Sequence, residues 1–560
     1  MKKLRLRKHS RHLFLSLALG AFATAPQNTN AAVIEHQGDR YIIHVAEMEL
    51  NGEESLLDIL QICPDLMTLD GNNLLGSDPF ANLYGQYAIR IDNQEYGLDY
   101  TTLLHHLKAR EIESIKICHN AEVMKGCTNM KRIIDINLRK QSGTSGHIGT
   151  TGDTYGGGGI LASVLHQGEK LRILSHVEGN MLRSSSEGIT NHYSHEGAKC
   201  SFLWTPTSKD VLEMNILQTY TRNRSTGRQG EYARDYHFQA DYTHTLGENG
   251  ATVLFTLSTD HTGDNSGGDE TPGSSTPALE KYHNRADYPW GVVEFAFPIF
   301  TQDLWLTAGF EGGFSIEKNC IAQHTSNSNY QDFYGQLDWN IGKWTFMVGD
   351  RHRIDHNNAY TVSAAYNFTP GHTLQGSFAR RFYSDLDSRM AYVSELKHTY
   401  SRPNLVISSQ IQNIRQDITN GHDNRLGIGS TIFWHTGILR LIAGFNYYWE
   451  RQSNEEHYEF QLYGSELSDG TYWDHKHSSY AVFKLAPQIS LATGWRIASN
   501  LIWSTRRHEY TLTYAPANLY AEVGAYKSFG KHWMLEGRYH DIAGQRMGNR
   551  AATIGATYYW

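Results

Sequence analysis

The sequence lacks long hydrophobic runs and is poor in proline. Beyond the N-terminal region, no segment approaches the roughly 18 consecutive apolar residues that a transmembrane helix needs, so a helical membrane protein is excluded. Only 12 of the 560 residues are proline. Because proline has no N–H to donate to a strand ladder, this scarcity is typical of a chain built mostly of paired strands.

Motifs of catalysis and nucleotide binding are also missing. No Gly-x-Ser-x-Gly or His-Glu-x-x-His segment occurs, and Gly156–Gly159 has no following Gly-Lys-Ser/Thr that would make it a phosphate-binding loop. We therefore predict a protein that is not an enzyme and requires no cofactor.

Positive charge is concentrated in the first residues. The segment MKKLRLRKHSRHLFLSLALGAFATA places six Lys and Arg before an apolar run over 13–25. This layout is that of a secretory signal peptide, which we expect to span residues 1–32, with cleavage near Ala23 or within 30–32. Its removal takes the net charge from −8 to about −14, and an acidic chain argues against a nucleic-acid partner.

Aromatic residues and glycine are abundant, with 33 Tyr, 21 Phe, 12 Trp and 51 Gly. From about residue 145 onward, runs of some ten residues alternate between apolar and polar. In 439–449, for example, Phe445 shares the apolar face and Asn446 lies on the other. A tilted strand of about ten residues crosses the hydrocarbon layer of a membrane, with one face toward lipid.

The expected connections alternate between short and long. Ten short turns are expected, at 167–170, 206–210, 246–250, 301–303, 341–343, 369–372, 401–404, 435–437, 492–494 and 529–531. Two strands joined by a longer polar loop lie between successive turns, which indicates about 22 strands, with an error of two to four. Bacterial outer-membrane barrels show this alternation, with the short turns on the periplasmic side, whereas a soluble β-propeller does not need it. The predicted fold class is an all-β membrane protein, an antiparallel transmembrane β-barrel in contact with the lipid of the bacterial outer membrane.

The C-terminal segment GNRAATIGATYYW alternates in the same way, with Tyr558 and Trp560 on one face. Because chain ends usually fray, we expect this strand to close the barrel by pairing with the first strand, near HIGTTGDTY (147–155). The final aromatic resembles the closing strand of outer-membrane proteins, which the barrel-assembly machinery recognises.

A barrel of this width encloses a lumen that needs a plug, and residues 33–141 precede the expected barrel domain, 142–560. This segment has a mixed α/β pattern: the strand RYIIHV, the helix GEESLLDILQIC, the strand pair YAIRIDNQEYG and the strands EIESIKI and KRIIDINLRK. The leucine-rich helix followed by a proline turn, the strand pair ending in Ile-Asp-Asn and the last two strands resemble the plug of TonB-dependent outer-membrane receptors.

The resemblance implies a function and partners. Such receptors bind a scarce nutrient (an iron chelate, haem, cobalamin or a similar small molecule) at external loops and import it to the periplasm with energy transduced by TonB. TonB contacts an extended segment by strand addition. Only Tyr41, Ile42, Ile43, His44 and Val45 have the required character, and they suit the first strand of the plug better. A non-transporting barrel acting as adhesin or scaffold and a passive porin remain alternatives.

Three of the five cysteines lie within 33–141. Cys118 and Cys127 flank a short loop, and the periplasm is oxidising, so the two residues form either a disulfide or a pair of free thiols. Their spacing does not match a zinc site with a second ligand pair.

Histidine is abundant, at 29 residues. Close pairs occur in the expected external loops: His192 with His195, His352 with His356, and His475 with His477. Neutral imidazole ligates haem iron, copper and zinc, so these residues are candidate ligands of a haem or metal cargo; alternatively, they are ordinary polar residues of the surface. The two longest expected loops, about 260–287 and 450–480, are where contact with cargo should concentrate.

Overall fold

The computed structural model describes residues 33–560 with several gaps. The gaps are 38–39, 49, 51–53, 64–65, 67–86, 93, 96–102, 105–106, 119–131, 140–141, 155, 187–188, 226–230, 267–281, 320–323, 355–357, 385–386, 419–420, 461–467, 506, 509–513, 516–517 and 544–550. The expected signal peptide, 1–32, lies outside the described residues. Among them, no helix has the length and apolar character needed to cross a membrane.

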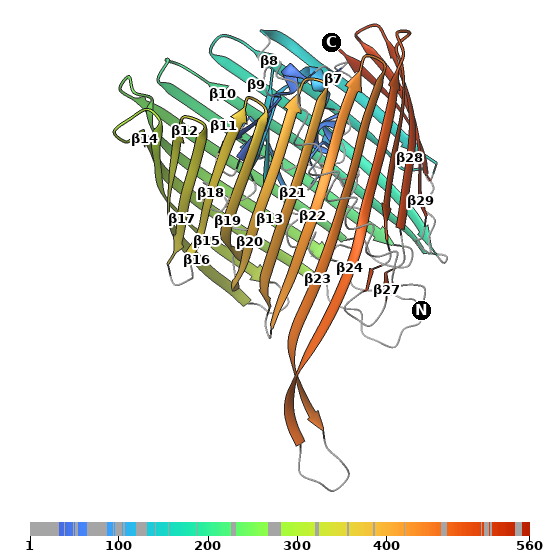
Figure 1. The fold of residues 1–560 in the computed structure, drawn as a ribbon. Coiled ribbons are helices and arrows are strands. Elements are labelled where there is room, and N and C mark those ends of the chain that lie inside the picture. Colours follow the sequence, from blue (N-terminus) through green and yellow to red (C-terminus); the bar gives the residue numbers. More distant parts are fainter. Residues whose placement is uncertain are drawn as a thin grey trace.

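In the described chain, 22 strands form a closed antiparallel barrel (Figure 1), as predicted. The strands are β7 Gly143–Asp153, β8 Gly158–Gln167, β9 Leu171–Ser186, β10 Ile189–Trp204, β11 Asp210–Ser225, β12 Glu231–Leu246, β13 Ala251–Ser266, β14 Tyr282–Pro298, β15 Leu304–Asn319, β16 His324–Ile341, β17 Trp344–Arg353, β18 Asn358–Thr369, β19 His372–Ser384, β20 Asp387–Arg402, β21 Leu405–Ile418, β22 Gly421–Thr436, β23 Leu439–Phe460, β24 Ser468–Ser490, β25 Trp495–Ser504, β28 Asn518–Phe529, β29 Trp533–Ala543 and β30 Ala551–Tyr559. Two short strands, β26 Arg507–His508 and β27 Tyr514–Ala515, pair outside the barrel ladder. Each of the ten expected short turns joins two consecutive barrel strands.

The terminal strand closes the barrel, as predicted from its pattern. β30 pairs with β29 on one side and with β7 on the other. At this seam the backbone N–H of Trp560 donates to the carbonyl of Gly146, at 3.0 Å. A Cβ on Gly146 would lie 2.5 Å from the Trp560 ring, so the seam needs a glycine there for the last aromatic to pack.

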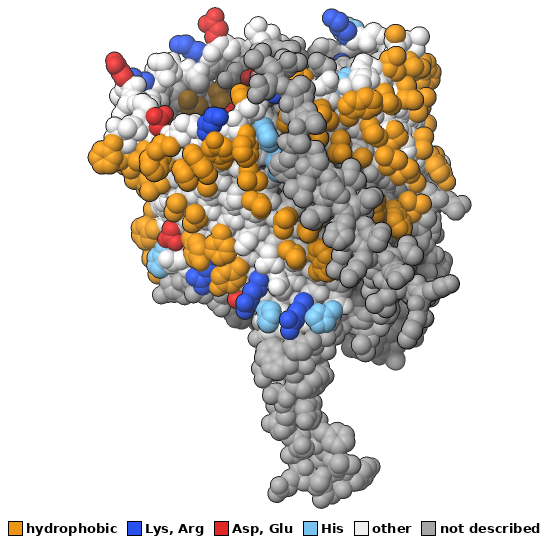
Figure 2. Space-filling view, viewed as in Figure 1, with side chains coloured by type: hydrophobic (Ala, Val, Ile, Leu, Met, Phe, Trp, Pro, Cys, Tyr) orange, Lys and Arg blue, Asp and Glu red, His pale blue; other side chains and the backbone are white. Residues whose placement is uncertain are grey.

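The alternation of side chains sorts them between the two faces of the wall. Asn446 is buried on the inner face, whereas Phe445, the residue before it, packs against Phe483 on the outer face, with ring centroids 5.0 Å apart and the rings tilted by 50°. Large hydrophobic side chains gather in a broad band on the outside of the barrel (Figure 2). A strand register that buries polar groups and exposes apolar ones suits a lipid-facing wall.

A six-stranded sheet lies inside the barrel, at the end where the short turns are (Figure 1). Its strands are β1 Ile34–Gln37, β2 Arg40–Ile43, β3 Tyr87–Ile91, β4 Gln94–Glu95, β5 Ile112–Cys118 and β6 Arg132–Leu138, in the order β1-β2-β5-β6-β3-β4. Only the β3–β6 pair is parallel. We call residues 33–139 the plug.

The plug helix α2, Leu56–Leu60, begins where the leucine-rich segment predicted a helix. Ser55 is its N-cap and forms a capping box with Asp58, which satisfies backbone donors at the helix start. Leu56, Ile59 and Leu60 face the core that the sheet supplies. Two short 3-10 turns, η1 Val45–Glu47 and η3 Ala109–Glu111, complete this small domain.

Several strands are longer than expected, because many have 16 residues instead of about ten. The expected loop 450–480 is instead mostly strand, since β23 continues to Phe460 and β24 starts at Ser468. This hairpin projects well beyond the other strands at the end away from the short turns (Figure 1). Likewise, the expected loop 260–287 contains the ends of β13 and β14.

Candidate functional site

The plug meets the barrel wall close to the short turns. Arg172, Arg440 and Arg496 are each the second residue of a strand that directly follows a short turn. All three turn their guanidinium groups toward plug carboxylates. Positive charge on the wall therefore faces negative charge on the plug.

Asp58 of α2 is the first of these carboxylates. Its Oδ1 lies 2.9 Å from Arg440 and its Oδ2 lies 3.7 Å from Arg496. Burial alone would raise the pKa of Asp58, but the two guanidinium groups and the capping bonds from Ser55 outweigh burial and hold the pKa well below its usual range. Asp58 thus caps the helix and ties it to two strands of the wall.

Asp92 makes the second charged contact. It sits in the turn between β3 and β4 with a positive φ of 51°, which Asp tolerates better than most residues. Asp92 pairs with Arg172 and also accepts a hydrogen bond from the backbone N–H of Leu138, at 3.1 Å. These two ion-paired carboxylates and their three arginines are called the plug contacts below.

Further contacts between plug and wall are uncharged or mixed. His36 bonds to Gln375 at 2.7 Å, and Arg40 donates to Gln336 at 3.0 Å. Elsewhere, Glu111 lies 3.5 Å from His147. Two cation–π contacts also join plug and wall. Lys397 of the wall lies 3.9 Å from the ring centroid of Tyr41, and Arg110 of the plug lies 4.0 Å from that of Tyr559. The plug is therefore held around much of its circumference.

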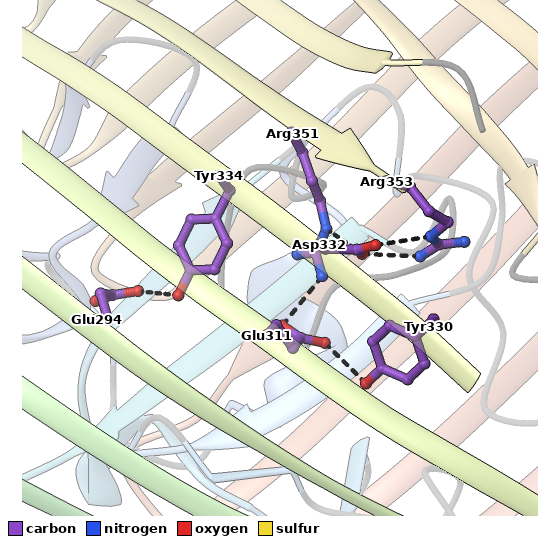
Figure 3. Close-up of polar contacts among 7 residues, drawn as sticks. All are labelled: Glu294, Glu311, Tyr330, Asp332, Tyr334, Arg351 and Arg353. Atoms are coloured by element: carbon purple, nitrogen blue, oxygen red, sulfur yellow. Dashed lines mark hydrogen bonds and ion pairs between the residues drawn. The ribbon is translucent and has the colours of Figure 1, made fainter. Parts of the chain in front are cut away.

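A second polar group lies on the inner face of the wall itself. Figure 3 shows two arginines, three carboxylates and two tyrosines that come from β14, β15, β16 and β17. This wall cluster consists of Glu294, Glu311, Tyr330, Asp332, Tyr334, Arg351 and Arg353.

Asp332 is the centre of the wall cluster. It accepts from Arg351 Nε at 2.7 Å and from Arg353 Nε at 2.9 Å. Arg351 also reaches Glu311, at 3.1 Å. Asp332 and Arg351 are fully buried, and Glu311 is 1% exposed. Buried charges are tolerated only when they are paired in this manner.

The two tyrosines extend the cluster across the strands. Tyr330 donates to Glu311 at 3.2 Å, and Tyr334 donates to Glu294 at 2.6 Å. A Cβ on Gly309, opposite Tyr334 in the register, would lie 2.4 Å from the tyrosine ring. Glycine at that position gives the ring its place on the inner wall, and the cluster forms a rigid, self-contained surface.

A hollow of about 660 Å³ opens beyond the wall cluster, toward the long connections. Its lining includes Asp235, Asp264, Tyr288 and Glu317, with Tyr288 bonded to Glu317 at 3.2 Å. The hollow is lined mostly by polar residues, is open to the outside and is large enough for a small molecule.

The structure does not bring the predicted histidine pairs together as loop ligands. His192 and His195 lie in β10, not in a loop. Because they are three residues apart in a strand, their side chains take opposite faces: His192 is exposed, whereas His195 is buried and bonds to Glu178 at 3.1 Å.

Three of the other predicted histidines, His352, His475 and His477, also lie in strands. His352 lies in β17 on the outer face and bonds to Asn358 at 2.6 Å, and His356 is outside the described residues. His475 and His477 lie in β24, opposite Ser453 and Arg451, and His477 is exposed. No group of three or more potential metal ligands occurs in the described part of the chain.

The segment expected to contact TonB is a paired strand of the plug. Tyr41 and Ile43 are buried, and β2 pairs with β1 on one edge and with β5 on the other. Strand addition needs a free edge, so the segment would have to leave the sheet first. Cys118 is buried at the end of β5, and Cys127 lies outside the described residues, so their disulfide stays a prediction.

Sequence reasoning missed the arginines of the wall cluster. They lie in DRHRIDH, the stretch selected for its histidines. The signal was present: Arg351 and Arg353 are two apart, so they share the inner face of a strand, while His352 between them takes the outer one.

No protein-family model matches the sequence, and no curated protein matches it either. Solved structures do match. The siderophore receptor PirA from Acinetobacter baumannii is 10% identical over 94% of this chain and 98% of its own, with a TM-score of 0.65. A point mutant of the ferric enterobactin receptor PfeA from Pseudomonas aeruginosa, in complex with enterobactin, is 12% identical over 93% of this chain and 99% of its own, with a TM-score of 0.66.

The ferric-catecholate import receptor Fiu from E. coli is 10% identical over 95% of this chain and 97% of its own, with a TM-score of 0.63. These matched structures are named as transport receptors and not as enzymes. The match spans nearly the full length of both chains and includes the region of the plug. The chain therefore has the fold of the TonB-dependent siderophore receptors, a 22-stranded barrel with a sheet domain in its lumen.

Proposed function

We propose that the protein is a receptor of the bacterial outer membrane that binds an iron chelate and imports it to the periplasm. The observation that carries this proposal is a plug docked inside a closed barrel through charged contacts to the wall. An open pore would not need such a domain, because its lumen would have to stay clear for diffusion. A receptor needs one, because the lumen must stay shut until cargo arrives.

The orientation follows from the connections. Short turns of outer-membrane barrels lie on the periplasmic side, so the plug is on that side and the projecting β23–β24 hairpin is outside. Cargo would then enter over the hollow lined by Asp235, Asp264 and Glu317. The matched receptors are named for siderophores, ferric enterobactin and ferric catecholates, which makes an iron chelate the first cargo to test.

Haem or a metal ion is a second cargo to test, because the predicted ligands are histidines. His195 faces the lumen, and His477 is exposed on the projecting hairpin's base. Loss of two imidazole ligands would abolish haem binding, so His475→Ala with His477→Ala tests this variant of the proposal.

Energy transduction is part of the proposal. TonB would pull on the plug from the periplasmic side and break the plug contacts. Because β2 has both edges paired, the segment Tyr41–Val45 can serve TonB only after β2 has left the sheet.

A second candidate is a non-transporting barrel that acts as adhesin or scaffold. The β23–β24 hairpin favours it, because a two-stranded ribbon of this length standing clear of the barrel is marginally stable alone and offers a surface to a partner.

Uptake in a deletion strain separates the candidates. Growth of the deletion strain should be lost on one nutrient source among ferric chelates, haem and cobalamin, and restored by the full chain. A protonophore should abolish uptake of the labelled chelate while surface binding persists. Uptake that continues without the proton-motive force would contradict energised import, and growth on every source would favour the adhesin or scaffold.

A further inference from the structure

One row of residues crosses the outer face of seven neighbouring strands, β18 to β24. Directly opposite one another in the register lie Tyr360, Arg380, Tyr392, Arg415, Asn424, Arg451 and His477. We call this set the arginine row. On the same face, several of the positions two residues nearer the barrel middle are hydrophobic. They include Val362, Phe378 and Leu426, which are 46%, 39% and 39% exposed. The row therefore marks the boundary where the hydrophobic band ends.

The row lies at the end of the barrel that carries the long connections. Figure 2 shows Lys, Arg and His side chains along the edge of the hydrophobic band that borders the projecting hairpin. At this level, a lipid-facing wall passes from acyl chains to headgroups.

Positive charge dominates the row. Arg380, Arg415 and Arg451 occupy every second strand, so they stand about 10 Å apart at the usual strand spacing. Tyr392 separates the first two, with the Arg380 guanidinium 6.0 Å from its ring centroid. The outer-face carboxylates nearby are Asp417, 4.0 Å from Arg415, and Asp350, opposite Tyr360 at the end of the row. The Arg415 side chain is still 55% exposed.

The other flank of the barrel also carries basic residues. There the outer face has Arg234, Arg285 and Lys318 at a similar level. Arg285 lies 3.4 Å from Asp287 on its own face, closer than Arg415 lies to Asp417 in the arginine row, at 4.0 Å. The arginine row has no comparably close partner for Arg451 among the described ion pairs.

A hollow of about 360 Å³ adjoins the end of the row. Leu426 and Trp449 line its apolar side, and Arg451 and His477 line its polar side. The rest of its lining is Asn424, Glu450, Ser478 and Ser479. An apolar floor below a pair of basic groups fits a molecule with an acyl chain and an anionic head.

We propose that the arginine row binds the phosphate groups of lipids in the external leaflet. Guanidinium groups match phosphate geometry and keep their charge at all relevant pH values. The acyl chain would lie along Trp449 and Leu426 while Arg451 and His477 take the headgroup. The location of this leaflet rests on the proposed outer-membrane function.

The test uses the purified full chain in nanodiscs and measures binding of phosphorylated lipid A. The triple variant Arg380→Gln/Arg415→Gln/Arg451→Gln should bind this lipid about 100-fold more weakly. The reason is that each basic group near a lipid surface contributes about fivefold to the affinity. The single variant Arg451→Gln should lose about fivefold. The matched control is Arg234→Gln, Arg285→Gln, Lys318→Gln, which should bind like the unmodified protein.

Two results would overturn the proposal. One is an unchanged affinity for phosphorylated lipid A in both the triple and the single variant. The other is an equal loss of affinity in the control, which would mean that the total charge of the protein determines binding. Dephosphorylated lipid A should bind all forms of the protein with the same affinity. If the triple variant preferred phosphorylated over dephosphorylated lipid A as strongly as the unmodified protein does, that result would also contradict the proposal. Iron-chelate uptake should be unaffected by the single and triple variants of the arginine row, so failure of the proposed function would appear in uptake while the lipid result still stands.

Discussion

The wall cluster and the plug contacts both pair arginine with carboxylate inside the lumen, but they join different things. In the wall cluster, Arg351, Asp332 and Glu311 all belong to the barrel, so the ion pairs join neighbouring strands of one hydrogen-bonded sheet. In the plug contacts, Asp58 and Asp92 belong to one domain and their arginines to another. The same chemistry therefore stabilises a rigid surface in one place and a separable joint in the other.

Exposure sharpens the difference. Asp332 and Arg351 are completely shielded from water, whereas the Asp58 side chain is 26% exposed and that of Asp92 is 21% exposed. Partial contact with water lowers the cost of separating a pair, because the released charges can be solvated. The plug contacts are thus suited to being broken during the proposed import of cargo, and the wall cluster is not.

The largest expected effect comes from breaking the wall cluster. Asp332→Asn leaves two buried arginines without their shared anion and should cost roughly 3–5 kcal/mol of barrel stability. This loss of stability is measured by thermal unfolding, with the folded fraction read from heat-modifiable migration on a gel. The control is Asp350→Asn, on the outer face of the same wall, which should cost far less. Equal stability of the two variants would show that the wall cluster does not hold the barrel together.

Breaking the plug contacts should have a smaller and more local effect. Arg440→Gln with Arg496→Gln removes both guanidinium partners of Asp58 and should loosen α2 by roughly 1–3 kcal/mol. Hydrogen exchange of the α2 amides should rise about 5- to 100-fold, while the melting of the barrel stays the same.

The conservative pair Arg440→Lys with Arg496→Lys serves as the control and should restore most of the protection, because the charge is kept. If Arg440→Gln with Arg496→Gln lowered barrel stability as much as Asp332→Asn does, the proposed difference between the plug contacts and the wall cluster would be wrong.

The plug contact at Asp58 should be insensitive to pH in the physiological range. The guanidinium groups hold the pKa of Asp58 well below its usual range, so its contribution is fully present above the unfolded-state value of about 3.9 and is lost only as the pH falls through the lower folded-state value. Exchange of the α2 amides, corrected for intrinsic rates, should be constant between about pH 5 and pH 8. If the corrected exchange of the α2 amides rose as the pH was lowered to 5, a titratable group other than Asp58 would control this plug contact.

The smallest effect is expected on the outer face beside the wall cluster. His352→Ala removes a bond to Asn358 and should change stability by about 0.5 kcal/mol or less, as exposed substitutions usually do. Arg353→Ala, one residue on, should be much more costly because it removes one of the two guanidinium partners of the buried Asp332. Binding of haem by the unmodified chain and its loss in His352→Ala would instead revive the histidine prediction.

The sequence determined which residues form strands and which face each side chain takes. Alternation placed Phe445 outside and Asn446 inside, and the short turns gave the strand count, because a side-chain period of two is a local property of an extended chain. The polar ends of strands were expected to be loops, which was wrong for His192, His195 and His477. Strand hairpins that extend past the membrane can carry polar residues on both faces, so composition does not mark where they end.

Tertiary structure alone decided which charges meet. Asp332 finds Arg351 only through the register of β16 against β17, and Asp58 finds Arg440 across 382 residues of sequence. The arginine row likewise exists only because seven strands align at one level. No local sequence pattern encodes strand register or the docking of the plug, since both depend on how distant segments pack. Register and docking bring separate arginines together in the wall cluster, the plug contacts and the arginine row.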